Sequence, residues 1–364
     1  MQLKTLALKN FKNAEEETLV FGSGINVICG ENASGKTNLL EAIFFFAAGK
    51  SFRGCRERDL IKFGEDTASA DVLFETANTA YRMGLRIGKT EKRKILVGGV
   101  PVRKLSEYLG LFRAVIFTPD HLALVKGAPE GRRRFLDLAI CQSFPRYAAS
   151  LNEYNRLLAQ KNALLKRDNA DQALLEVYHE RMAALAAIIT TNRYKYVEQL
   201  TDTASGFQKE MSCGKEALAL KYVCQCGEPA RPAEELKKSY EALFAEKCEQ
   251  EIRSGFALFG PQKDDFSVSI SGKNARMFGS QGQQRSAVLA LKLAEGELSK
   301  RLTGEYPVFL LDDILSELDK GRREYILSGL SGKQVILTGC EDELFSGYHP
   351  SERIIVEHGV ARNI

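Results

Sequence analysis

The segment that most constrains this chain is residues 30–37, which fit the phosphate-binding pattern G-x-x-x-x-G-K-[ST]. An apolar run at residues 25–29 leads into it, and a helix-forming run at residues 38–48 follows it. In such a loop the glycines let successive backbone N–H groups turn toward one anion, and the helix N-terminus adds partial positive charge. The sequence therefore predicts an α/β protein in which a strand, a loop and a helix bind a nucleotide.

The residue types of this loop each suit a nucleotide phosphate. Lys36 supplies a point charge for the β- and γ-phosphates, and Thr37 offers a hydroxyl to Mg²⁺. A short pattern also arises by chance, but here the strand, loop and helix are all in register. The predicted cofactor-binding residues of the loop are Gly30, Glu31, Asn32, Ala33, Ser34, Gly35, Lys36 and Thr37.

A second candidate site follows an apolar run at residues 307–311, which is typical of a parallel strand buried on both faces. The run ends in Asp312 and Asp313, and open α/β sheets bind ligands at the carboxyl ends of their strands. We expect Asp312 to hold Mg²⁺ and Asp313 to orient the attacking water. The alternative is that the two carboxylates cap the short helix predicted at residues 315–318.

The 364 residues exceed what one hydrophobic core usually serves, so two lobes are expected. Strand-like runs dominate residues 1–125 and 256–364, which predicts one head domain built from both chain ends. Residues 126–255 instead repeat apolar side chains at three- and four-residue steps, which predicts an inserted helical lobe. No helix in this lobe is predicted to be long enough for an extended coiled coil, so a short arm is expected.

Other features exclude further classes of protein. No segment reaches the length of a membrane span and the N-terminus lacks a signal-peptide core, so a cytosolic protein without a membrane partner is expected. Most of the eight cysteines lie in apolar runs, as reduced thiols do. Cys213, Cys224 and Cys226 raise the question of zinc, but C-x-C spacing suits zinc poorly and no histidine is near. The four histidines form no pattern with acids or nucleophiles, so no catalytic triad is visible.

The net charge of +4 says little, but basic residues are unevenly distributed. Residues 126–167 hold nine Lys or Arg and three acids, which favours contact with a polyanion. Solvated helix faces give the same pattern, and the charges could also brace the neighbouring lobe. The candidate DNA-binding residues in this stretch are Arg132, Arg133, Arg134 and Lys161.

Taken together, these segments resemble the RecF family, bacterial recombination-mediator ATPases related to the SMC proteins. The resemblance covers essentially the full length. It rests on residues 8–13, 35–42, 49–53, 117–120, 133–137, 260–265, 280–285 and 311–319. It implies an ABC-type ATPase head, a mixed or parallel sheet flanked by helices, with an inserted, mainly helical lobe.

The resemblance also implies that residues 280–283 are the signature motif, in which Ser280, Gly282 and Gln283 contact the γ-phosphate of ATP held by the other subunit. The glycines allow close backbone approach, and the following helix would direct its positive end at phosphate. The family places Asp319 at the dimer seam. Many ABC heads carry a histidine where this chain has Thr338, and a glutamate in place of Asp313. No Q-loop glutamine is identified.

The function that the resemblance implies is an ATP-gated dimeric clamp on DNA with ATP and Mg²⁺ as cofactors. Asp313 and Lys36 would be catalytic in a weak ATPase. The implied partners are single-stranded, double-stranded or junction DNA, a second copy of the chain, and mediators of the RecR and RecO type that help to load recombinase at gaps. A transporter ATPase subunit would keep its two motifs closer together, and an SMC-like bridging protein would need a longer arm.

Overall fold

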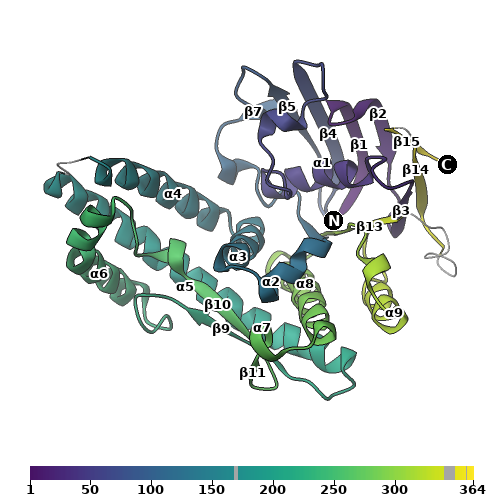
Figure 1. The fold of residues 1–364 in the computed structure, drawn as a ribbon. Coiled ribbons are helices and arrows are strands. Elements are labelled where there is room, and N and C mark those ends of the chain that lie inside the picture. Colours follow the sequence, from purple (N-terminus) through teal and green to yellow (C-terminus); the bar gives the residue numbers. More distant parts are fainter. Residues whose placement is uncertain (168–170, 340–348, 358) are drawn as a thin grey trace. The chain divides into compact units, whose positions relative to one another are not determined.

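The structure is a computed structural model that describes residues 1–167, 171–339, 349–357 and 359–364 (Figure 1). The chain divides into two compact units. The first comprises Met1–His121 and Leu291–Ile364, and the second comprises Leu122–Ala290. Cys340 and His358 lie outside the described residues. Among the described residues, no helix combines the length and apolar character that crossing a membrane requires.

The first unit contains an antiparallel sheet with the strand order β2-β1-β4-β5-β6-β7. Its strands alternate buried and exposed side chains, as expected when one sheet face packs on the core and the other faces solvent. The strands are β1 (Gln2–Phe11), β2 (Ala14–Val20), β4 (Thr67–Glu75), β5 (Ala80–Gly88), β6 (Lys94–Val97) and β7 (Val100–Val102).

A second, mixed sheet of this unit has the order β15-β14-β3-β13-β12-β8. Five neighbouring strands run parallel and the edge strand β15 is antiparallel to β14. Every residue of β8 and β12 is buried, which explains their continuous apolar sequences. The strands are β3 (Ile25–Cys29), β8 (Ala114–Phe117), β12 (Val308–Leu311), β13 (Val335–Gly339), β14 (Glu352–Glu357) and β15 (Val360–Asn363).

Helix α1 (Lys36–Ala48) begins directly at the phosphate loop and is almost entirely buried, including three consecutive phenylalanines at 44–46. A helix that is apolar on all sides belongs in a core, so α1 anchors the loop to the interior of the first unit. The unit also contains α9 (Lys320–Gly329) and the 3-10 turns η1 (Glu57–Leu60), η2 (Leu105–Glu107) and η5 (Leu315–Glu317). Helix α8 (Gln281–Thr303) and the turn η3 (Pro119–Leu122) cross from one unit to the other.

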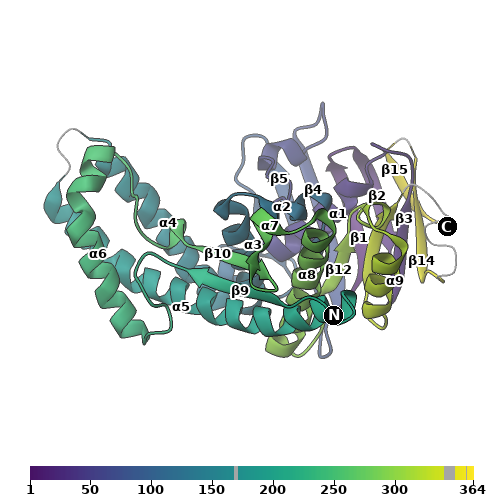
Figure 2. The same ribbon diagram turned by 60° about the horizontal axis from the view of Figure 1, so that its bottom comes forward.

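The second unit packs three long helices against one another, with α5 (Gln172–Met211) beside α4 (Pro145–Leu165) and α6 (Ala233–Ser254) (Figures 1 and 2). The unit also contains a three-stranded antiparallel sheet with the order β11-β10-β9, and β9 packs against α5. Its strands are β9 (Leu218–Val223), β10 (Asp265–Ile270) and β11 (Lys273–Asn274). The remaining elements of the unit are α2 (Ala123–Lys126), α3 (Pro129–Ser143), α7 (Ala275–Phe278) and the 3-10 turn η4 (Pro261–Lys263).

The extent of this second unit differs from the helical lobe that the sequence placed at residues 126–255. Strand β10 pairs along its length with β9, from Asp265 opposite Val223 to Ile270 opposite Leu218. The chain that returns after residue 255 therefore belongs to the same unit up to Ala290. Strand β9 lies inside the run that was predicted to be helical, and α5 extends over 40 residues of that run.

Candidate nucleotide site

The loop at residues 30–37 joins β3 to α1, as the pattern predicted. Lys36 is buried, and its Nζ atom donates hydrogen bonds to the carbonyl oxygens of Gly30 at 2.7 Å and Glu31 at 2.8 Å. The side chain thus folds back over its own loop. Lys36 is also the first residue of α1, and a phosphate group is favoured at the N-terminus of a helix.

The turn between β1 and β2 holds this loop from outside. Asn13 Nδ2 donates to the carbonyl oxygen of Ser34 at 3.0 Å, and Asn13 Oδ1 accepts from Asn38 Nδ2 at 2.6 Å. Gly35 has φ 115°, and a Cβ atom there would lie 2.2 Å from Asn13 Nδ2. Glycine is therefore required at position 35 both by the backbone conformation and by the contact with Asn13.

One loop side chain provides a test of whether a phosphate fits. The Oγ atom of Ser34 is buried and has no hydrogen-bond partner within the described residues. A buried hydroxyl without a partner costs about 1–3 kcal/mol, so such groups are rare unless a ligand satisfies them. The loop therefore offers an unused donor where the pattern expects phosphate oxygens.

The carboxylate of Asp312 is buried and contacts side chains from helix α1 and strand β13. Its Oδ1 atom accepts hydrogen bonds from Thr37 Oγ1 at 2.8 Å and from Thr338 Oγ1 at 3.0 Å. Burial raises the pKa of Asp312, while the bonds from the two hydroxyls act in the opposite direction. The strand order β3-β13-β12 explains why Thr37, Thr338 and Asp312 lie together. Strand β13, which carries Thr338, lies between β3, which leads into the phosphate loop, and β12, which ends just before Asp312.

These oxygen atoms have the chemistry of a magnesium site, since Mg²⁺ prefers one or two protein oxygens and takes its other ligands from phosphate and water. Within the described residues, no group of three or more His, Cys, Asp and Glu side chains could hold a metal by itself. Thr37 and Asp312 therefore fit Mg²⁺ only together with a bound phosphate, and their assignment as its ligands stays a prediction.

Asp313 has a different environment from its neighbour. Its φ of 49° is unusual for a residue with a side chain, and its N–H donates to Thr338 Oγ1 at 3.0 Å. Ser316 Oγ donates to Asp313 Oδ1 at 3.1 Å. Strained backbone of this kind concentrates at functional sites. The capping alternative does not hold for Asp312, whose carboxylate accepts hydrogen bonds from Thr37 and Thr338.

The segment 280–283 forms a capping box at the start of α8. The N–H of Ser280 donates to Gln283 Oε1 at 2.8 Å, and the N–H of Gln283 donates to Ser280 Oγ at 3.2 Å. Gln283 Nε2 also donates to Glu216 Oε1 at 2.9 Å. The box holds Ser280 exposed at a helix N-terminus, with Gly282 in the first turn. These residues belong to Leu122–Ala290, whereas the loop and Asp312 belong to the other unit.

Comparisons with known proteins agree with this geometry. A family model described as the RecF/RecN/SMC N terminal domain matches residues 2–361. The DNA replication and repair protein RecF of Clostridium novyi (strain NT) is 38% identical over 339 residues, which cover 93% of each chain. The chain belongs to the RecF family. A second relative, the DNA replication and repair protein RecF of Geobacillus kaustophilus (strain HTA426), is 41% identical over 342 residues, which cover 92% of this chain and 91% of that protein.

Solved structures confirm the predicted fold class. The recombination mediator protein RecF-ATPrS in the RecFOR pathway superposes with a TM-score of 0.93 at 32% identity, covering 100% of this chain and 98% of that one. An Smc head bound to the C-winged helix domain of ScpA gives a TM-score of 0.58 at 17% identity, covering 100% and 97%. That second likeness shows the fold alone. The chain has the RecF and SMC type of ABC ATPase head.

Two of the four residues predicted to bind DNA are buried in this RecF-family chain. Lys161 has no exposed surface, and its Nζ atom lies 2.6 Å from Glu251 Oε2. Arg132 is buried and pairs with both carboxylate oxygens of Asp265, at 2.6 and 2.8 Å. The prediction was wrong for Lys161, because a side chain without exposed surface cannot reach a phosphate, and it was wrong for Arg132, which is only 6% exposed and has its guanidinium group paired with Asp265. Their charges neutralise acids that the fold brings from distant parts of the same unit.

The other two arginines of this group remain untested as DNA contacts. Arg133 is half-buried and donates to the carbonyl oxygen of Asp264 at 2.8 Å, and Arg134 is also half-buried. Both lie on α3, which packs on β10. Arg132 and Arg133 therefore contact Asp265 and Asp264 of their own unit, whereas the sequence alternative had these charges brace the neighbouring lobe.

Replacing Lys161 with alanine is expected to destabilise the second unit by about 3–5 kcal/mol, because Glu251 would be left buried and unpaired. Urea unfolding would measure this change. Lys238→Ala is the matched control, since Lys238 is exposed on α6 and its loss should change the unfolding free energy by less than about 0.5 kcal/mol. A Lys161 variant of normal stability but weakened DNA binding would contradict the structural role.

Asn13, Arg53 and Thr338 were not assigned to the site by sequence reasoning. Arg53 is exposed, its Nη1 atom donates to Asn38 Oδ1 at 3.4 Å, and its charge lowers the pKa of Asp312. Asn13 and Arg53 lie in segments that carried the family resemblance, which was the only available signal. Thr338 was noted only as the residue that stands where many ABC heads carry a histidine. The structure shows its hydroxyl group hydrogen-bonded to Asp312 and to the backbone of Asp313.

Proposed function

We propose that this chain is an ATP-dependent DNA-binding switch of recombinational repair. Two copies close on ATP, hold DNA between them and open after slow hydrolysis. The observation that carries the proposal is the convergence of Thr37 and Thr338 on Asp312, beside a phosphate loop whose Ser34 hydroxyl lacks a partner. The family and the relative described as RecF-ATPrS support ATP as the nucleotide.

In this proposal each residue of the site has a definite task. When bound, ATP with Mg²⁺ supplies a phosphoanhydride bond whose cleavage resets the switch. Lys36 leaves the carbonyl groups of Gly30 and Glu31 to pair with phosphate. Thr37 and Asp312 are the residues that would hold the metal. An Asp313 Oδ atom orients the attacking water and accepts its proton, and Thr338 fixes the backbone from which Asp313 projects.

The second half of the proposed site comes from another copy of the chain. The capping box gives Ser280 and Gly282 a fixed conformation at the N-terminus of the 23-residue α8, where partial positive charge favours a γ-phosphate. Neither half is complete alone, so ATP binding and dimerisation become linked equilibria. A closed dimer would join the DNA-binding surfaces of both copies.

Binding to DNA should then be dominated by phosphate contacts, independent of base sequence and steeply weakened by salt. We propose gapped and junction DNA as the physiological substrate, and mediators of the RecO and RecR type as protein partners. The RecF-ATPrS relative is described as a recombination mediator protein in the RecFOR pathway, which supports this assignment. An SMC-like bridging role is the second candidate, favoured only by the Smc-type fold.

Asp313→Asn tests the proposed function directly. We expect ATP hydrolysis to fall by about 10²-fold or more, because the variant cannot accept the proton of the attacking water. ATP affinity should stay the same, so DNA should be retained longer after a pulse of ATP. Single-turnover hydrolysis and DNA release by fluorescence anisotropy are the two measurements.

Glu317→Gln is a matched control, since Glu317 is an exposed carboxylate four residues later. It should hydrolyse ATP at the wild-type rate. If Asp313→Asn also hydrolyses ATP normally, Asp313 is not the catalytic base. If hydrolysis stops but DNA is released as fast as before, hydrolysis does not open the clamp.

A further inference from the structure

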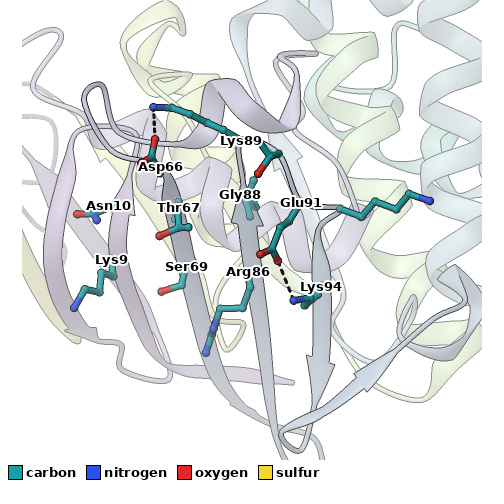
Figure 3. A pocket seen from close by; sticks show the side chains of 14 residues that line it. Lys9, Asn10, Asp66, Thr67, Ser69, Arg86, Gly88, Lys89, Glu91 and Lys94 are labelled. Carbon is teal, nitrogen blue, oxygen red and sulfur yellow. Dashed lines mark hydrogen bonds and ion pairs between the residues drawn. The ribbon is translucent and has the colours of Figure 1, made fainter.

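The exposed face of the antiparallel sheet in the first unit contains a hollow of about 620 Å³ (Figure 3). It is formed by β1, β4, β5, β6 and the turn between β5 and β6. Its lining includes two acids, Asp66 and Glu91, and a larger set of basic residues: Lys9, Arg86, Lys89, Lys92 and Lys94. The hollow lies wholly within Met1–His121 and is separate from the nucleotide site.

The strand register places three of these cations in one row. Lys9 on β1 is opposite Ser69 on β4, Ser69 is opposite Arg86 on β5, and Arg86 is opposite Lys94 on β6. Figure 3 shows these four side chains side by side across the four strands. We name Lys9, Arg86 and Lys94 the basic row. With strands about 4.8 Å apart, the row spans roughly 14 Å.

Stability of the sheet alone does not favour this arrangement. Arg86 and Lys94 are direct cross-strand neighbours, and like charges in that position destabilise a sheet. The surrounding sequence adds to the excess, because residues 81–104 contain eight Lys or Arg and a single acid, Glu91. This density of positive charge is higher than that of residues 126–167, where the sequence analysis placed the candidate DNA-binding residues.

The acidic partners of the basic row leave it available to a ligand. Lys9 lies 3.4 Å from Glu16, Arg86 lies 2.9 Å from Asp71, and Lys94 lies 3.0 Å from Glu91. The three cations are 61%, 42% and 61% exposed. The pairs of Lys9 and Lys94 are exposed and contribute little to stability, so a phosphate can replace their carboxylates at small cost. Arg86 keeps its contact with Asp71, which is 20% exposed, and can meet a phosphate with the exposed part of its own side chain. Arg132 and Lys161, in contrast, are themselves buried and are paired with Asp265 and Glu251.

We propose that the basic row, with Lys89 and Lys92 beside it, binds the phosphate backbone of duplex DNA. The row is long enough to meet several phosphates, which follow each other every ~3.4 Å along one strand of the helix. Duplex is favoured over single-stranded DNA because none of the described residues that line the hollow is aromatic, and single-strand binding relies on stacking of bases on aromatic rings. This inference rests on the proposed DNA-binding function and assigns it a surface.

The test is the variant Lys9→Gln/Arg86→Gln/Lys94→Gln, titrated with a fluorescent 30-base-pair duplex at several salt concentrations. Each lost phosphate contact lowers the slope of log K against log salt by about 0.9, so we expect the slope to fall by about 2–3 and affinity to fall tenfold or more. Titrations are made with a nonhydrolysable ATP analogue and without nucleotide. The row is therefore tested even if ATP has no effect on DNA binding.

The matched control, Lys238→Gln/Arg253→Gln/Lys320→Gln, removes the same charge from three exposed positions outside the hollow. Equal losses in the two triple variants would overturn the proposal, as would a loss confined to single-stranded DNA. If the basic-row variant binds duplex normally while ATP still promotes binding, the surface is wrong and the proposed function stands. If wild-type binding ignores ATP but the row variant alone loses salt dependence, the surface is right and the ATP switch is wrong.

Discussion

Replacing Lys36 with alanine is expected to abolish ATP-dependent retention of DNA. The Lys36 side chain is the only cation that the loop sequence itself provides, and it is held over the loop by the carbonyl groups of Gly30 and Glu31. Each charged hydrogen bond to phosphate is worth about 1.5–3 kcal/mol, so losing two should weaken ATP binding by roughly 10²-fold or more. Without bound ATP, the proposed contact that joins the two copies is missing, so the closed dimer should not form.

Two titrations would check this expectation: ATP affinity by calorimetry, and DNA binding by anisotropy with and without ATP. Lys50→Ala is the matched control, because Lys50 follows the same helix and is exposed. It should leave both affinities unchanged. Thermal unfolding of both variants shows whether the fold survives. ATP-stimulated DNA binding that persists in a folded Lys36→Ala protein would refute the clamp mechanism.

Replacing Ser280 with arginine is expected to block the ATP-dependent dimer and leave ATP binding to the single copy intact. Ser280 lies in a different compact unit from the phosphate loop and is exposed at the start of α8. An arginine there fills the space into which a γ-phosphate from the other copy must approach. It also removes the cap to Gln283, which costs about 1 kcal/mol.

The variant Ser280→Asn distinguishes the effect of losing the helix cap from the effect of losing the contact with the γ-phosphate. Asparagine caps helices as well as serine does, so this variant should keep the local structure of α8. We expect Ser280→Arg to lower the dimer fraction at saturating ATP by at least tenfold, measured by light scattering, and Ser280→Asn to lower it less. If Ser280→Arg destroys ATP binding by the isolated copy, the motif does not act across the dimer.

Features that are formed by residues contiguous in the sequence could be predicted from the sequence. The phosphate loop is eight contiguous residues, and the buried strand before Asp312 is a continuous apolar run, so both could be recognised directly. The role of Thr338 could not, because it arises from the order β3-β13-β12, which brings residues 37, 312 and 338 together. Strand β9 was missed for a related reason: its partner β10 lies more than 40 residues away.

Counting charges along the chain gave the least reliable prediction. The excess of basic residues at 126–167 is real, but Arg132 and Lys161 are neutralised by Asp265 and Glu251, which lie 133 and 90 residues later. A charge count treats every cation as exposed, whereas a fold decides which of them face solvent. The basic row is the opposite case, since strand register assembles it from three separate strands.

The central claim is that ATP holds two copies of this chain together. Sedimentation velocity of the Asp313→Asn variant at saturating ATP tests it most directly, because slow hydrolysis preserves the closed state. The account predicts a species of twice the mass of the 40.5 kDa chain with ATP, and the single chain without it. A single-chain species at every ATP concentration, from a protein shown to bind ATP, would contradict it.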